Sequence, residues 1–138
     1  MSTSKFPRRP LSERSPYHLD EFREREIIYF CLQYPGWRKK LNHYKLLKSQ
    51  GEWSDPVGDE ATERAMLERN MKIVEDACKR VSEDQWNLIL NGVTDPDSNW
   101  YNFKSIKGLK CGRDAYYNFK HQVYFYVNLK DSRENLTV

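Results

Sequence analysis

Apolar residues recur at helical spacing through the first third of the chain, and this pattern predicts two helices. Ser15 and Pro16 are typical of a helix start, because Ser caps the first turn and Pro lacks an N–H that would go unbonded there. Pro35 and the glycine after it separate the two helices. The apolar positions that carry the two patterns are Leu19, Phe22, Ile27, Phe30, Cys31, Trp37, Leu41, Tyr44 and Leu47. We therefore expect residues 15–48 to form an N-terminal helical hairpin.

The middle of the chain is also predicted to be helical. A long amphipathic helix is expected over residues 59–81. Ser82 and Gln85 have the spacing of a capping box at the start of the next helix, and Asn91 with the glycine after it is typical of that helix's end. The apolar residues of these two helices are Met66, Ile73, Val74, Ala77, Val81, Trp86, Leu88, Ile89 and Leu90.

No strand pattern competes strongly with these helices, so the fold class is predicted to be all-α. The alternating apolar residues from Val123 to Leu129 would suit a strand in isolation, and they are the nearest rival. A stretch with Gly, Pro, Asp and Ser after the second helix is typical of a linker. The predicted organisation is a disordered tail over residues 1–14, the hairpin over 15–48, a linker over 49–58, a helical domain over 59–130 and a C-terminal tail over 131–138.

The segment from residue 100 to residue 129 has the layout of a helix-turn-helix. Gly108 is suited to a sharp turn, and Leu109 would fill the wedge between the helices on either side. Apolar residues at i, i+3 and i+6 predict the first helix, and a longer stripe predicts the second. These residues are Trp100, Phe103 and Ile106 in the first helix, and Tyr116, Phe119, Val123 and Val127 in the second.

The outer face of this motif would carry side chains suited to a DNA groove. Arg can donate two hydrogen bonds to guanine, Asn can pair with adenine, and Lys or Tyr can hold phosphate. The predicted DNA-binding residues are Lys104, Lys107, Lys110, Arg113, Asp114, Tyr117, Asn118, Lys120 and His121. Arg113, Asp114 and Tyr117, nearest the helix start, would reach the bases. A plain antiparallel helical hairpin with a solvated outer face explains the same pattern.

Charge is distributed unevenly along the chain, although the net charge is only +3 over 138 residues. Residues 1–51 carry eleven Lys/Arg against five Asp/Glu, and residues 52–84 carry five against ten. Residues 100–130 carry six Lys/Arg against one Asp, a net of +5. A basic block of this kind is an electrostatic footprint for phosphate, although lysines on a solvated face would give the same count.

The C-terminal segment also resembles a known family. Phe103, Ile106, Gly108 and Leu109, followed by the Cys-Gly-Arg-Asp-Ala-Tyr-Tyr run at residues 111–117, are similar to the helix-turn-helix of region four of bacterial sigma factors. The likeness is closer to the Rin/Arp-type late transcription regulators of phages and prophages of Gram-positive bacteria. The Tyr-Phe-Cys-Leu-Gln-Tyr-Pro-Gly-Trp run at residues 29–37 also resembles the start of such phage proteins. The resemblance implies a regulator that binds duplex DNA.

Other function classes find less support in the sequence. No apolar run approaches the roughly 20 residues of a membrane helix, and the first residues lack the apolar segment of a secretory signal, so a cytoplasmic location is expected. The resemblance to phage and prophage regulators implies that the cell is a bacterial host. Three scattered cysteines and three dispersed histidines give no disulfide framework and no paired metal-ligand spacing.

No phosphate loop, dinucleotide fingerprint or nucleophile elbow is present, so no enzyme activity and no cofactor are expected. The pairs Glu68–Lys72 and Glu75–Lys79 are spaced as i, i+4 surface ion pairs rather than as a catalytic set. The alternative to DNA binding is a protein-interaction module that contacts RNA polymerase or another transcription protein, with the acidic segment over residues 52–84 as its contact face.

Overall fold

The computed structural model describes residues 14–51, 59–99 and 112–136, and these residues form helices joined by turns. The helices are α1 (Glu21–Leu32), α2 (Tyr34–Ser49), α3 (Asp59–Val81), α4 (Trp86–Thr94) and α6 (Arg113–Leu136). No strand occurs within these ranges, so the predicted all-α fold class is confirmed for them. The rival strand from Val123 to Leu129 lies inside α6.

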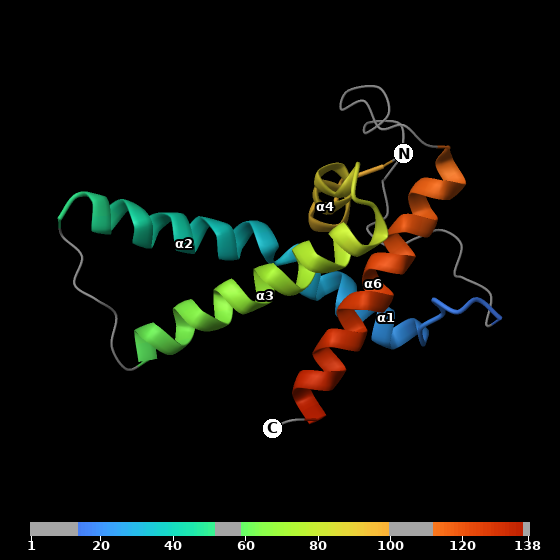
Figure 1. Ribbon diagram of the computed structural model, residues 1–138, viewed down its shortest axis with the longest axis horizontal. Coiled ribbons are helices and arrows are strands. Elements are labelled where there is room, and N and C mark those ends of the chain that lie inside the picture. The colour runs from blue at the N-terminus through green and yellow to red at the C-terminus, as the bar shows by residue number, and fades with distance from the viewer. Residues whose placement is uncertain (1–13, 52–58, 100–111, 137–138) are drawn as a thin grey trace.

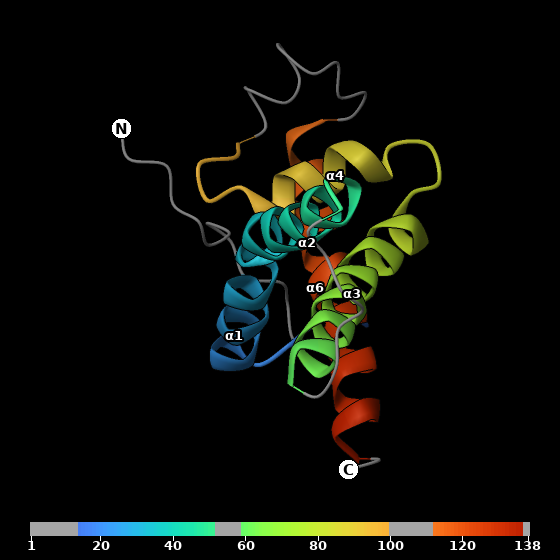
Figure 2. The same ribbon diagram turned by 90° about the vertical axis from the view of Figure 1, so that its left-hand side faces the viewer.

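The two longest helices, α3 and α6, cross each other at the centre of the molecule (Figure 1). α2 packs chiefly against α3, and the two helices extend together to one side of the crossing (Figures 1 and 2). α1 packs chiefly against α6 and α4 instead of lying along α2. α6 is therefore covered from three sides, by α1, α3 and α4.

One hydrophobic core joins all of these helices. Its fully buried members include Ile28 from α1, Val74 from α3, Ile89 from α4, and Val123 and Val127 from α6. α2 adds Tyr34, Trp37 and Leu41. The expected N-terminal hairpin thus shares its core with the helices of the C-terminal part. Large aromatic side chains in this core supply much of the buried area that a chain lean in aliphatic residues needs.

The first helix begins later than the sequence pattern predicts. Asp20 caps α1, because its carboxylate accepts hydrogen bonds from the backbone N–H of Phe22 at 3.1 Å and of Arg23 at 3.3 Å. Ser15 instead closes a short turn, with its hydroxyl accepting from the N–H of Tyr17 at 3.2 Å. Pro35 lies in the first turn of α2 and does not end α1, since a first-turn residue needs no N–H partner.

The long helix has the predicted bounds, and the start of the next helix is partly as expected. The Ser82 hydroxyl accepts a hydrogen bond from the Gln85 N–H at 3.2 Å, and α4 begins one residue later. The prediction that α4 ends at Asn91 and Gly92 is wrong, because the helix continues to Thr94. A Cβ atom at Gly92 would lie 2.8 Å from the Tyr116 hydroxyl, so this glycine allows α6 to pack closely on α4.

The predicted surface ion pairs of α3 are replaced by other contacts. Glu68 pairs with Arg64 at 3.5 Å, and Glu75 accepts a hydrogen bond from the Tyr34 hydroxyl at 2.7 Å. The Lys79 ammonium lies over the Trp86 ring, 4.6 Å from its centroid. The charged side chains of α3 thus help to hold α2 and α4 in place. None of the helices in the described ranges is long and apolar enough to cross a membrane.

Candidate nucleic-acid interface

The start of α6 exposes part of the predicted DNA-binding set. Arg113, Asp114 and Asn118 are exposed, and Tyr117 is half-buried. The first turn of the helix is closed by a hydrogen bond from the Tyr116 N–H to the Gly112 carbonyl at 3.0 Å. Polar side chains therefore surround the N-terminal end of a helix whose middle turns, over residues 120–127, are largely buried.

Lys120 was predicted to lie on the outer face of this helix, and that prediction is wrong. Its side chain is only 4% exposed, and its ammonium donates a hydrogen bond to the Ser98 hydroxyl at 3.3 Å. The ammonium also lies 5.6 Å from the centroid of the Tyr116 ring and 5.9 Å from that of Tyr117. Lys120 is therefore held between α6 and the turn after α4, out of reach of a DNA groove.

Burial changes the acid–base chemistry of Lys120. Loss of hydration disfavours the charged ammonium and lowers its pKa from 10.5 to about 8, although the nearby Asp95 carboxylate acts in the opposite direction. The Ser98 hydroxyl that accepts from Lys120 also donates to the Gly92 carbonyl at 2.6 Å. A buried cation is thus tied to the loop that follows α4.

His121 is also buried, which corrects its predicted place on the outer face. Its ring is 1% exposed, and Nδ1 lies 3.1 Å from a carboxylate oxygen of Glu24 on α1. About two turns of α6 further on, Asn128 accepts a hydrogen bond from the Arg23 side chain at 2.6 Å. These contacts fasten α1 to α6 and give His121 a structural role.

The wrong predictions for Lys120 and His121 have one physical cause. The sequence pattern was interpreted as a single inner stripe, as for a helix that touches the protein on one side. α6 touches three helices, so the residues at positions 120, 121 and 124 are buried as well as the predicted Tyr116, Val123 and Val127. Tyr124, which lies outside the predicted stripe, is fully buried. A large aromatic residue at that position was the signal in the sequence that the buried face of the helix is wider than one stripe.

Several predicted residues cannot be placed. Lys104, Lys107 and Lys110 lie outside the described residues, and so do Leu109 and the whole predicted first helix of the helix-turn-helix.

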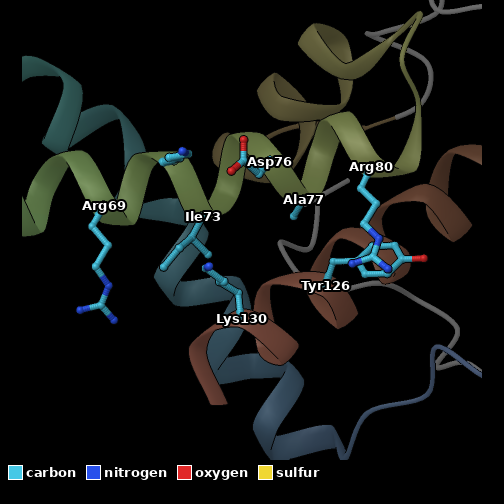
Figure 3. A pocket seen from close by; sticks show the side chains of 8 residues that line it. Arg69, Ile73, Asp76, Ala77, Arg80, Tyr126 and Lys130 are labelled. Atoms are coloured by element: carbon cyan, nitrogen blue, oxygen red, sulfur yellow. The ribbon is translucent and has the colours of Figure 1, made fainter. Parts of the chain in front are cut away.

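A basic groove between α3 and α6 is one surface that the sequence analysis missed (Figure 3). It has a volume of about 370 Å³ and a floor formed by Ile73 and Ala77. Its charged lining residues are Arg69, Lys72, Arg80, Lys130 and Asp76. The Arg80 guanidinium lies over the Tyr126 ring at 4.3 Å from the centroid. The spacing of residues 69, 72, 76 and 80 places them on one stripe of α3, which the sequence alone could have shown.

A second basic surface lies on α2. Each of its five Lys/Arg residues is exposed, and the helix contains no Asp or Glu. These residues are Arg38, Lys39, Lys40, Lys45 and Lys48. Basic side chains are thus gathered at two places besides the start of α6: the groove between α3 and α6, and the exposed surface of α2.

The described residues contain no group of three or more His, Cys, Asp or Glu side chains that could hold a metal ion. No protein family, curated protein or solved structure was found to match the chain.

Proposed function

We propose that the chain is a transcriptional regulator of phage or prophage genes that binds duplex DNA in a sequence-directed manner. The observation that carries the proposal is the exposed start of α6, where Arg113 and Asn118 lie at the surface with Tyr117 half-buried. In helix-turn-helix proteins, the N-terminal residues of the second helix contact base edges in the major groove. The residues at this end of α6 have the donors and acceptors that such contacts need.

Rigid support of the helix favours the same function. Side chains that recognise bases must be held in place by the scaffold beneath them. Tyr116, Lys120 and His121 are buried under the exposed turn and bind α6 to α4 and α1. In this proposal Lys120 and His121 position the recognition end of α6 without contacting DNA.

Arg113 is assigned the main role in base recognition. It lies closest to the N-terminal end of α6, and its guanidinium can donate two hydrogen bonds to one guanine. Asn118, exposed five positions later, is assigned to adenine or to the backbone, and Tyr117 to phosphate. No catalytic step and no cofactor enter this proposal.

The test is a binding selection from a pool of random duplexes, followed by affinity measurements on the selected site and on random DNA. Arg113→Ala should weaken binding to the selected site more than to random DNA, by about 1–3 kcal/mol of discrimination. Arg25→Ala is the matched control, because Arg25 is an exposed arginine on α1, where it pairs with Glu21 at 2.8 Å. The control should leave the ratio of the two affinities unchanged. An equal loss on both duplexes for Arg113→Ala would refute the assigned base contact.

A protein-interaction module is the second candidate, and one observation favours it. Phe22 and Tyr29 are 69% and 47% exposed and lie seven positions apart on α1, a spacing that places them on one face. Exposed aromatic side chains are common at protein interfaces. In this case the partner would be RNA polymerase or another transcription protein. It predicts that the chain selects no duplex from the random pool.

A further inference from the structure

The charge of α2 is unusual for a helix that packs in a protein core. Five of its 16 residues are Lys or Arg, and none is Asp or Glu. A surface helix ordinarily carries both acidic and basic side chains, because i, i+4 pairs of opposite charge stabilise it. α2 lacks the acidic half of that arrangement within its own sequence.

The cations of α2 are not spread evenly around its axis. At about 100° per residue, Arg38 and Lys45 fall on one flank, together with Asn42 and Ser49, and Lys39 lies about 100° further around the helix, opposite the buried residues. These residues are all exposed. Lys40 points to the opposite flank, where its ammonium pairs with Glu63 of α3 at 3.1 Å. The flank away from α3 therefore presents three cations and two neutral polar side chains.

Among the described residues, these three cations have no anionic partner, since no carboxylate lies within ion-pair distance of Arg38, Lys39 or Lys45. The Arg38 guanidinium lies over the Tyr34 ring at 5.6 Å from its centroid, a contact that orients the group without using its hydrogen-bond donors. We name the surface formed by Arg38, Lys39, Asn42, Lys45 and Ser49 the α2 basic flank.

α2 and the start of α6 are separated along the longest axis of the molecule (Figure 1). In Figure 1 the two lie on opposite sides of the crossing of α3 and α6, with α4 between them, and the C-terminal end of α6 points away from both. From Arg38 to Lys45 the helix rises by roughly 10 Å at about 1.5 Å per residue. That length corresponds to about three base pairs of duplex at 3.4 Å each. A ligand that contacts both helices must therefore be extended and must pass α4, as a duplex laid along this axis would (Figure 1).

We infer that the α2 basic flank contacts the phosphate backbone of the duplex whose bases α6 reads. The inference rests on the proposed function, because it takes duplex DNA as the ligand. Arg38, Lys39 and Lys45 donate to phosphate oxygens, and Asn42 and Ser49 can add neutral hydrogen bonds. Phosphate contacts carry no sequence information, so the flank adds affinity for any duplex and leaves base choice to α6.

The experiment measures the dependence of DNA affinity on salt for the full chain and for a triple variant, Arg38→Gln, Lys39→Gln and Lys45→Gln. Glutamine keeps a long polar side chain and a similar helix propensity, so the fold is retained. Each lost phosphate contact should flatten the slope of log K against log salt by about 0.9. For three contacts, the fourfold salt increase from about 50 to about 200 mM should weaken the wild type roughly 40-fold more than the variant.

Lys48→Gln is the matched control, since it removes one exposed charge from the same helix outside the flank. It should leave the slope within experimental error of the wild type. The single variants Arg38→Gln and Lys45→Gln should each flatten it by about one contact. If Lys48→Gln flattens the slope as much as either single variant, net charge and not the flank governs binding, and the inference is overturned.

Failure of the inference and failure of the proposed function give different results. If the wild type selects a duplex but the triple variant has an unchanged salt slope, the inference is wrong and DNA recognition by α6 stands. If the triple variant flattens the slope on random DNA while Arg113→Ala changes both affinities equally, the α2 basic flank stands and the base contact is wrong. If the wild type binds no duplex in low salt, both are overturned.

Discussion

Lys120 offers the sharpest test of how the structure revises the sequence-based account. Its ammonium is buried between α6 and the loop after α4, with one hydrogen bond to Ser98. Keeping a charge in such a site costs stability, because the ammonium gives up its hydration. Lys120→Met replaces the charged group with an apolar side chain of similar length. We expect this substitution to stabilise the protein at neutral pH.

The magnitude follows from the pKa of Lys120. Burial lowers that pKa from 10.5 to about 8, and one pKa unit corresponds to about 1.4 kcal/mol. The folded state therefore carries a cost of about 3 kcal/mol below pH 8, where the ammonium is charged in both the folded and the unfolded chain. Between pH 8 and pH 10.5 the unfolded chain binds more protons at Lys120 than the folded chain does. The free energy of unfolding therefore rises with pH over this range, and the cost of the buried charge disappears.

The assay is urea unfolding of both proteins at several pH values from 7 to about 10.5. The free energy of unfolding of Lys120→Met should exceed that of the wild type by up to about 3 kcal/mol at pH 7. The difference should shrink toward the upper end of the range, and groups common to both proteins cancel in it. Lys45→Met, at an exposed position, is the control and should stay within about 0.5 kcal/mol. A strongly destabilised Lys120→Met, or a difference that is constant with pH, would contradict the buried ammonium.

Two further predictions concern the core. Gly92→Ala should destabilise the protein by about 1 kcal/mol in urea unfolding, because the clash 2.8 Å from the Tyr116 hydroxyl outweighs the better helix propensity of alanine. The loss should be smaller in a Tyr116→Phe background, and a stabilising Gly92→Ala would contradict the close packing. Burial raises the pKa of Cys31 to about 12 and also raises that of Cys78, so in a Cys111→Ser variant both thiols should react with a thiol reagent only as fast as the protein unfolds. Rapid labelling of the native protein would show that these cysteines are accessible.

Prediction from the sequence was most accurate for helix bounds and helix breaks, which depend on the pattern of neighbouring residues. The long amphipathic helix over residues 59–81 has the bounds expected from its apolar period and the linker before it. The break between α1 and α2 was also expected, although proline lies just inside α2 and not at the end of α1. Periodicity and proline chemistry are properties of neighbouring residues, so the sequence contains them in full.

The errors arose where a distant partner decides the outcome. Gly92 has the local signature of a helix end, but its role is to admit the Tyr116 side chain from α6. Lys120 and His121 have the polarity of surface residues, but Ser98 and Glu24 supply them with buried partners. No property of Lys120 itself shows that α1 and α4 cover both sides of α6. Among the described residues of the predicted site, the exposed ones are therefore Arg113, Asp114 and Asn118, with Tyr117 half-buried.

The central claim is that the chain binds duplex DNA with a sequence preference set at the start of α6. One measurement tests it most directly: the ratio of affinities for a selected duplex and a random duplex, determined for the wild type and for Arg113→Ala at one salt concentration. The account predicts a clear preference in the wild type that falls by about 1–3 kcal/mol in the variant. A wild type that binds the two duplexes equally, or an unchanged ratio in Arg113→Ala, would contradict it.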